Sequence, residues 1–139
     1  MYFWAKRRPM STKNKEIIIT ENAPKAIGPY SVGVRVGNLI FTAGQLGLDP
    51  NTGELIQGGI ESETEQSINN LRSVLQAAGC DLDSVVKTTV FLRNINDFPQ
   101  MNGVYAKFFS ADFPARSTIQ AAALPKGAAV EIEAIAYVE

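Results

Sequence analysis

Apolar and polar residues alternate along several stretches of the chain, which is the period of a β-strand that buries one face. In residues 85–93 one face holds Val86, Thr88, Val90 and Leu92, and the other holds Val85, Lys87, Thr89, Phe91 and Arg93. Further strands are predicted at residues 16–20, at residues 117–124 before Pro125-Lys126-Gly127, and from Val130 onward.

A hairpin is predicted where residues 32–36 and 39–45 flank Gly37-Asn38, because this pair favours a two-residue turn. Gly44 lies inside the second strand of this hairpin. A glycine there indicates either a bulge or a close approach by a ligand or another chain.

The first helical pattern follows a capping motif. Ser62-Glu63-Thr64-Glu65 matches the capping box that begins many helices, with acidic side chains in the first turn. We expect this helix to run to about Ala78, with Gly79 as the residue that ends it. Its apolar face is formed by Ile68, Leu71, Val74, Leu75 and Ala78.

A second helix is predicted to begin near Asn96-Asp97, with Pro99 in its first turn, where no backbone N–H is needed. Its apolar stripe holds Phe98, Met101, Tyr105, Phe108 and Phe109. Asn102 lies on the same stripe, and a buried amide needs a hydrogen-bond partner. Either it bonds to neighbouring backbone or it reaches a functional site.

These elements predict a two-layer α+β domain, in which one face of a mixed six-stranded sheet carries both helices. The opposite face then presents Val85, Thr89, Phe91 and similar residues. A monomer would leave this apolar face in contact with water. Exposed apolar patches usually mark an interface, and a symmetric homo-oligomer is the default arrangement.

The first residues differ in character from the rest. Met1-Tyr2-Phe3-Trp4 is apolar and Lys6-Arg7-Arg8-Pro9 is basic, which is the wrong order for a secretory signal and too short to cross a membrane. We expect residues 1–15 to form a disordered N-terminal tail, or in part an early start before Met10. Residues 16–139 are expected to form a single domain of a cytoplasmic protein.

Composition narrows the chemistry. The 139 residues include 13 basic and 14 acidic side chains, a balance that does not indicate binding through nucleic-acid phosphates. There is no histidine, which excludes histidine-based triads, general bases and metal sites. Cys80 is the single cysteine, so an intrachain disulfide and a cysteine-rich zinc site are excluded. It has no basic neighbour in sequence and is expected to pack rather than to react.

Phe113-Pro114-Ala115-Arg116-Ser117 places an arginine at the start of a predicted strand, with few polar residues near it. Its guanidinium is always charged and presents a fork of donors suited to a carboxylate or phosphate. A pairing with the last strand could bring Arg116 and Glu131 into one pocket, or the two could form a structural ion pair. Tyr30, after the Gly28-Pro29 corner, either packs over the sheet end or directs its phenol into a pocket.

Together these stretches resemble the RidA family, also called YjgF or UK114. The matching stretches are Asn22-Ala23-Pro24, residues 27–31, Thr42-Ala43-Gly44-Gln45, Ala77-Ala78-Gly79, residues 86–91, Phe113-Pro114-Ala115-Arg116-Ser117 and residues 131–136. Single pieces are weak signals, but the ordered set is specific and covers the chain from about Ile18 to Val138. The resemblance favours a functional role for Arg116.

The resemblance implies a chorismate-mutase-like fold and a homotrimer with sites between subunits. It implies hydrolysis of reactive 2-imino acids, such as 2-iminobutanoate and 2-iminopropanoate, or of their enamine tautomers, to 2-oxo acids and ammonia. No cofactor and no metal are expected. Some members of the family are described as ribonuclease-type translation inhibitors or as chaperone-like proteins. An RNA-binding or regulatory role is therefore the alternative, although the charge balance gives it little support.

In the family's pattern Arg116 matches the carboxylate-binding arginine, and Tyr30, Asn102 and Glu131 match other site positions. The implied mechanism has Arg116 hold the substrate carboxylate through two hydrogen bonds. Glu131 then positions the attacking water, directly or through Tyr30. In a trimer we expect Arg116 and Glu131 to lie across the interface from Tyr30 or Asn102.

Backbone groups near Gly44 and Thr118 are expected to bind the imine nitrogen of the substrate. Two residues depart from the family's pattern. Ala43 stands where many members carry serine, and Thr118 stands where many carry cysteine. These departures bear on substrate size and on the polar contacts beside the reacting carbon.

Overall fold

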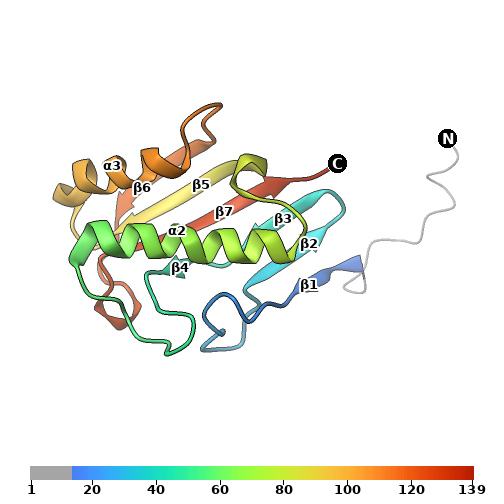
Figure 1. Ribbon diagram of the computed structural model, residues 1–139, viewed down its shortest axis with the longest axis horizontal. Coiled ribbons are helices and arrows are strands. Elements are labelled where there is room, and N and C mark those ends of the chain that lie inside the picture. Colours follow the sequence, from blue (N-terminus) through green and yellow to red (C-terminus); the bar gives the residue numbers. More distant parts are fainter. Residues whose placement is uncertain (1–13) are drawn as a thin grey trace, which may run out of the picture.

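The protein is a β-sheet covered on one side by two α-helices within residues 14–139, the part of the chain that the computed structural model describes (Figure 1). Of the tail predicted at residues 1–15, residues 1–13 lie outside the described residues. The strands are β1 (Glu16–Ile18), β2 (Gly33–Val36), β3 (Leu39–Thr42), β4 (Gln45–Leu46), β5 (Val85–Leu92), β6 (Ala115–Gln120) and β7 (Val130–Tyr137). The helices are α2 (Gly59–Ala77) and α3 (Phe98–Phe108), with single 3-10 turns at Leu82–Ser84, Ile95–Asp97 and Pro125–Gly127.

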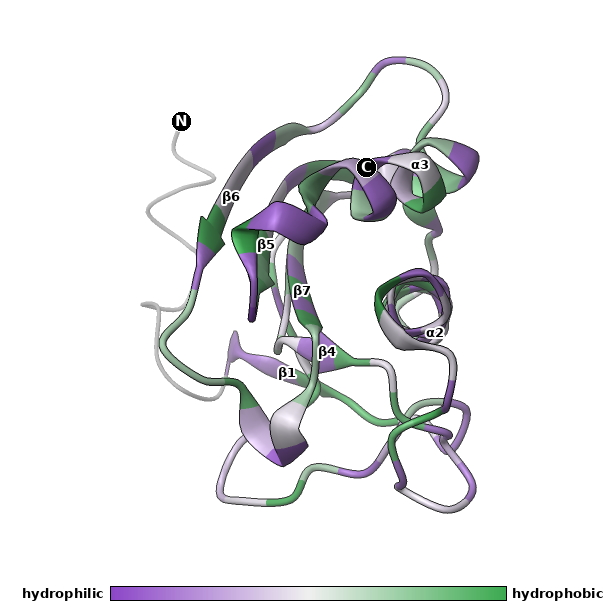
Figure 2. Cartoon of the chain, turned by 90° about the vertical axis from the view of Figure 1, so that its left-hand side faces the viewer, coloured by the Kyte–Doolittle hydropathy of each residue, from purple (hydrophilic) through white to green (hydrophobic). Residues whose placement is uncertain are grey.

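The strands form one mixed sheet in the order β1-β2-β3-β7-β5-β6, and β4 pairs with β7 beyond the end of β3. Every pair is antiparallel except β5 with β6. Figure 2 shows the sheet on one side and both helices on the other. The predicted two-layer α+β architecture is confirmed, and the two-residue β4 adds a seventh strand to the six expected.

The core fills the space between the sheet and the helices. The predicted apolar face of α2 is confirmed, because Ile68, Leu71, Val74 and Leu75 are all fully buried. Ile68, Leu71 and Leu75 share one core cluster with Ile40, Val90, Leu92, Val130 and Ile132 of the sheet and with Met101, Tyr105 and Phe109 of the α3 region. Val74 packs instead in a smaller cluster with Ile18 and Ala23. No helix within residues 14–139 has the length and hydropathy needed to cross a bilayer.

The capping box predicted at residues 62–65 is wrong. The helix α2 begins at Gly59, after Gly58 with a φ of 118° and no side-chain cap. Glu63 is therefore buried inside the helix, where its carboxylate accepts the backbone N–H of Ala129 at 2.8 Å. The predicted end of this helix is confirmed, since Gly79 has a φ of 91° and follows the last turn.

The start of β5 also differs from the prediction. Val85 is buried opposite Ala136, whereas Val86 is exposed, because the pairing with β7 shifts between Val85 and Lys87. This irregularity is a β-bulge, which turns the first residues of the strand over relative to the rest. The assignment of Val85 to the open face of the sheet is therefore wrong, and the predicted alternation holds from Thr88 onward.

The hairpin at Gly37-Asn38 is confirmed, with Val36 paired to Leu39 across it. The return strand is interrupted, however, because the pairing registers of β3 and β4 with β7 differ by one residue. The break is a bulge at residues 43–44. Similarly, β6 ends at Gln120 rather than continuing to residue 124.

The face of the sheet opposite the helices carries a row of register partners that crosses all six main strands. The row consists of Ile17, Val34, Phe41, Ile135, Lys87 and Ala115. Neighbouring positions hold Phe91 and Ile119, but also Thr89, Glu133 and Ser117. This open face is thus largely apolar with a polar band, and Phe41 is 40% exposed on it.

Candidate active site

Arg116 lies on β6, the edge strand of the sheet, between two aromatic rings of α3. Its guanidinium carbon is 4.7 Å from the centroid of the Tyr105 ring and 5.4 Å from that of Phe98. Aromatic faces attract a cation but leave its N–H donors free for a ligand. No acidic side chain within residues 14–139 forms an ion pair with Arg116.

A cavity of about 320 Å³ opens beside this guanidinium. It is lined by Asn102, Tyr105, Ala106, Phe109, Phe113, Pro114 and Arg116. The Asn102 amide makes no hydrogen bond to other groups in residues 14–139, so it is available to a ligand in this cavity. Arg116 and Asn102 therefore form one half of a candidate site.

Thr118 follows Arg116 by two residues on the same face of β6, since their partners on β5 are the buried Thr88 and Val90. Its Oγ1 atom is buried and has no hydrogen-bond partner in the described part of the chain. Burying a hydroxyl without a partner costs about 1–3 kcal/mol. Thr118 does not line the cavity beside Arg116, but its unpaired hydroxyl on the same face of β6 makes it a candidate ligand contact.

Glu131 contributes to a second, smaller cavity of about 50 Å³, whose lining also includes Tyr30, Gly44 and Lys25. A Cβ atom on Gly44 would lie 2.8 Å from Cδ of Glu131, so the glycine makes room for this side chain. The close approach at Gly44 is thus made by the chain's own glutamate. The Tyr30 hydroxyl accepts the backbone N–H of Ile27 at 3.3 Å, which fixes the phenol at the rim.

The carboxyl group of Glu131 is more basic than that of an ordinary glutamate. Partial burial raises its pKa, and the nearby charge of Glu133 raises it further. Both effects disfavour the ionised form. A carboxylate with a raised pKa is a stronger base when ionised, which suits a group that accepts a proton from water.

The structure does not bring Arg116 and Glu131 into one pocket of a single chain. Strand β5 lies between β6 and β7, and Arg116 pairs with the buried Thr88 on the helix side. Glu131 pairs instead with Phe91, whose side chain is on the open face. The predicted pairing of these strands is therefore wrong, because strand order is a non-local property of the sheet.

Within one chain the candidate residues group differently from the arrangement that we expected across an interface. Arg116 shares its cavity with Asn102, and Glu131 shares its cavity with Tyr30. Each chain therefore carries two separate groups of candidate site residues on opposite sides of the sheet. We call them the arginine half-site (Arg116, Asn102, Thr118) and the glutamate half-site (Glu131, Tyr30, Gly44).

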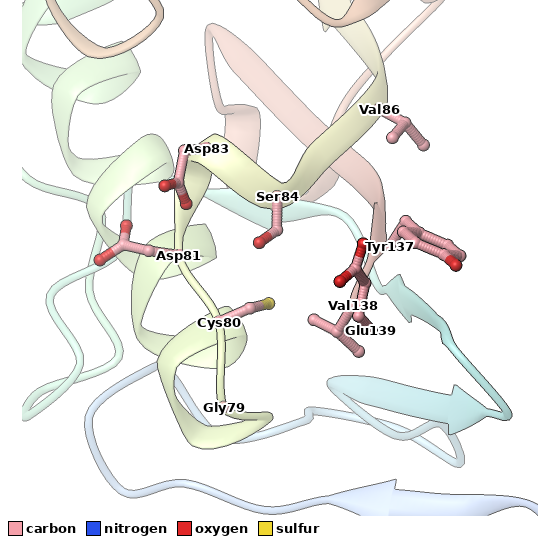
Figure 3. Close-up of a pocket in the computed structure, with 9 residues that line it drawn as sticks. All are labelled: Gly79, Cys80, Asp81, Asp83, Ser84, Val86, Tyr137, Val138 and Glu139. Carbon is pink, nitrogen blue, oxygen red and sulfur yellow. The ribbon is translucent and has the colours of Figure 1, made fainter.

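A larger hollow of about 710 Å³ lies elsewhere, around the segment that follows α2 (Figure 3). It contains none of the predicted site residues, and the carboxylates of Asp81, Asp83 and Glu139 would repel an anionic substrate. Burial raises the pKa of the Cys80 thiol, which keeps it protonated and unreactive. Cys80 packs against the core as predicted.

The described residues offer no obvious metal site. In residues 14–139 no cluster of three or more histidine, cysteine or acidic side chains is placed to hold a metal ion.

Comparison with known proteins identifies the family. The model described as endoribonuclease L-PSP matches residues 20–138. The chain belongs to the RidA/YjgF/L-PSP family. The resemblance seen in the sequence is thereby confirmed, and RidA-type relatives can be compared over nearly the whole chain.

One RidA-family relative is the 2-iminobutanoate/2-iminopropanoate deaminase of Bos taurus, 53% identical over 91% of this chain and 93% of that protein. The crystal structure of RidA from an Antarctic Psychrobacter matches with a TM-score of 0.86 and 45% identity, over 88% of this chain and 99% of that one. The structure of Escherichia coli TdcF with bound serine matches with a TM-score of 0.85 and 42% identity, over 89% and 99%. The YjgF-like fold is therefore confirmed.

Sequence reasoning missed the residues that surround the predicted ones. Phe98 and Tyr105 were assigned to the buried stripe of α3, yet both also hold the guanidinium of Arg116. Their spacing of seven residues puts both on one side of the helix, but only the position of β6 shows what they face. Lys25, which lies between the matched stretches Asn22-Ala23-Pro24 and residues 27–31, lines the Glu131 cavity.

Proposed function

We propose that this protein hydrolyses reactive 2-imino acids, including 2-iminobutanoate and 2-iminopropanoate, to 2-oxo acids and ammonia. The observation that carries the proposal is the Arg116 guanidinium, held between two rings at a cavity and free of acidic partners in residues 14–139. The Bos taurus relative is named for these two substrates, and TdcF binds serine. All three compounds are small carboxylates with nitrogen on the second carbon.

The arginine half-site suits the carboxylate end of such a substrate. A guanidinium can donate two parallel hydrogen bonds to a carboxylate, which fixes the plane of the ligand. The Asn102 amide and the Thr118 hydroxyl supply further polar contacts beside it. The apolar part of the cavity, formed by Phe109 and Phe113, suits a short alkyl side chain.

The glutamate half-site suits the attacking water. Glu131 has a raised pKa and, once ionised, accepts a proton from a water molecule held against it. Tyr30 at the rim of the same cavity is placed to orient that water. We propose that backbone groups at Gly44 bind the imine nitrogen on this side.

The reaction needs little activation, because a protonated imine carbon is already electrophilic. The water oxygen forms a bond to the second carbon while Glu131 takes one of its protons, which gives a carbinolamine. Glu131 returns that proton to the nitrogen and then accepts the hydroxyl proton as the carbon–nitrogen bond breaks, which forms the 2-oxo acid and releases ammonia. The ammonia takes this proton from Glu131 and leaves as ammonium, so the carboxylate is regenerated. Most of the acceleration then comes from orientation of the carboxylate and the water.

We propose that the two half-sites of one active site come from different subunits, because they lie on opposite sides of the sheet in one chain. We propose a homotrimer, in which the arginine half-site of one subunit faces the glutamate half-site of the next. The apolar row on the open face, which includes Ile17 and Phe41, supports burial of this face against other copies. The cytoplasmic location predicted from the sequence is part of this proposal, and fractionation of cells expressing the tagged chain tests it.

The decisive experiment generates 2-iminobutanoate with threonine dehydratase and follows loss of the imine spectroscopically. We expect the protein to accelerate this loss. The Arg116→Ala variant should lower kcat/KM by at least about 100-fold, since each hydrogen bond to a charged group contributes about 1.5–3 kcal/mol. Arg116→Lys should also lose most activity, because it lacks the fork of donors.

Arg35→Ala is the matched control for these variants. Arg35 is an arginine of the hairpin whose Nε donates to the Gly37 carbonyl at 2.9 Å, far from β6 in the strand order. It should keep full activity. Unchanged decay of the imine in the presence of wild-type protein would refute the proposed function.

RNA cleavage, the alternative expected from the sequence, has only the description of the family model in its favour. Ribonucleases of the acid–base type commonly rely on histidine, and this chain has none. We therefore do not propose it for this protein.

A further inference from the structure

Tyr105, a residue of the core, is fixed in place by two contacts, one at its hydroxyl and one at its ring. Its hydroxyl forms a hydrogen bond of 2.8 Å with Oγ1 of Thr88, and Thr88 is 0% exposed. Its ring stacks on Phe109 with centroids 4.5 Å apart. Tyr105 is thus held at the hydroxyl and at the ring, with little freedom to move.

The ring of the same tyrosine packs against the guanidinium of Arg116. The guanidinium carbon lies 4.7 Å from the Tyr105 centroid, the shorter of its two aromatic contacts. Thr88 is the direct register partner of Arg116 across β5 and β6. The three residues therefore contact one another in a cycle. The strand pairing joins Arg116 to Thr88, the hydrogen bond joins Thr88 to Tyr105, and the Tyr105 ring packs against the guanidinium of Arg116.

Arginine side chains lose about 2 kcal/mol of rotamer entropy when they are ordered by a ligand. The fixed ring of Tyr105 reduces this loss of entropy, because it orients the guanidinium before the ligand binds. Burial raises the pKa of the Tyr105 hydroxyl, and the hydrogen bond with Thr88 and the charge of Arg116 act, more weakly, in the opposite direction. The hydroxyl therefore remains protonated at neutral pH, and its hydrogen bond with Thr88 remains intact.

We propose that Tyr105 and Thr88 are positioning residues for Arg116: their buried hydrogen bond holds the ring that aligns the guanidinium with the substrate carboxylate. The proposal rests on the proposed function in assigning the carboxylate to Arg116. It assigns no contact between Tyr105 or Thr88 and the reacting atoms.

The test compares Tyr105→Phe, which keeps the ring and removes the hydroxyl, with Thr88→Val, which removes the other partner. Each should raise KM for 2-iminobutanoate on the order of ten-fold with little change in kcat, because the lost interaction is with the bound carboxylate. The inhibition constant of the product, 2-oxobutanoate, should rise by the same factor. The double variant should be no worse than the worse single variant, because both changes remove one hydrogen bond.

Tyr137→Phe is the matched control. Its hydroxyl is 3.4 Å from Nδ2 of Asn38 in the turn between β2 and β3, Tyr137 pairs with Leu39 of β3, and KM should not change. A merely structural role would lower stability without changing KM or the inhibition constant at temperatures well below unfolding. Equal KM values for wild type, Tyr105→Phe and Thr88→Val would overturn the proposal while leaving the deaminase function intact.

A second readout is independent of catalysis. The Nε–Hε signal of Arg116, assigned by its loss in Arg116→Lys, reports the order of the side chain through NMR relaxation. We expect its order to fall in Tyr105→Phe and in Thr88→Val but not in Tyr137→Phe. Unchanged order in the first two variants would overturn the positioning role even if the protein proved not to be a deaminase.

Discussion

The position that a Cβ atom would take on Gly44 lies 2.8 Å from Cδ and 3.0 Å from Oε2 of Glu131. The glutamate side chain thus occupies the space that any other residue at position 44 would need. Gly44→Ala should push the carboxyl group out of place at little cost in stability, because the atoms that must move belong to a flexible side chain. We expect kcat/KM to fall about 10–100-fold, since positioned proton transfer contributes about 10²–10⁴-fold.

Gly103→Ala is the matched control for this variant. Gly103 is an exposed residue of α3, and nothing lies within 4 Å of a Cβ atom built on it. Alanine there should raise stability by about 0.5–1 kcal/mol without changing the rate. Full activity in Gly44→Ala would argue against any role for the position of Glu131.

The pH dependence of activity should follow the charge beside Glu131. The pKa of Glu131 is raised first by burial and then by the charge of Glu133, so the base becomes protonated at a higher pH than an ordinary glutamate. The variant Glu133→Gln removes the second cause and should shift the acid limb of kcat/KM to lower pH. Glu65→Gln, an exposed glutamate of α2, should leave the limb in place. An acid limb that does not move in Glu133→Gln would contradict the assignment of Glu131 as the base.

The same shift predicts an effect on stability. Because the pKa of Glu131 is higher in the folded than in the unfolded chain, its contribution favours folding at low pH and is lost as pH rises through the folded pKa. Glu131→Gln should therefore raise Tm at pH 7 while abolishing activity. The gain should disappear below about pH 4, where the unfolded carboxyl is also protonated. Scanning calorimetry across this range checks the sign.

Thr118 offers a test in which stability and activity move in opposite directions. Its buried Oγ1 has no partner within residues 14–139, and Oγ1 of Thr64 on α2 is in the same situation. Replacing either threonine by valine should stabilise the protein by about 1 kcal/mol, since it removes an unsatisfied polar atom. Only Thr118→Val should also lower kcat/KM, by severalfold, because Thr64 lies on α2 and is not part of the arginine half-site. Equal activity of the two variants would remove Thr118 from the substrate contacts.

The sequence predicted the elements that depend on local patterns. The hairpin at Gly37-Asn38 and the helix end at Gly79 follow from the conformations that glycine allows. The predicted capping box is wrong because the Glu63 carboxylate accepts a hydrogen bond from the backbone N–H of Ala129, which is distant in sequence. The prediction that Val85 lies on the open face of the sheet is wrong because a bulge depends on the pairing with the neighbouring strand.

The site was predictable residue by residue but not as an arrangement. Proline and glycine neighbours, together with the family pattern, selected Arg116 and Tyr30. Whether Arg116 and Glu131 share a cavity depends on β5 lying between their strands, which no local pattern encodes. The contact between the Tyr105 ring and Arg116 could not be predicted for a related reason. A ring that contacts both the core and a cation shows only its apolar character in the sequence.

Assembly and activity should fail together when the open face is charged. Phe41 is the better position than Phe91, because Phe91 is the register partner of Glu131 and a charge there would also act on the glutamate half-site. Phe41 lies in the apolar row, pairs with Ile135 and is 40% exposed in a single chain. A trimer that buries this row cannot accommodate Phe41→Glu without burying an unpaired charge, which costs several kcal/mol.

Light scattering should therefore give wild type three times the chain mass of 15.1 kDa and give Phe41→Glu a lower mass. The variant should lose activity although Arg116 and Glu131 are intact in every chain, because neither half-site is sufficient alone. Ala77→Glu, on the exposed side of α2, is the control and should remain trimeric and active. Mixing Arg116→Ala with Glu131→Gln subunits should restore part of the activity, since some interfaces then combine an intact arginine half-site with an intact glutamate half-site. A fully active monomer would refute the shared site.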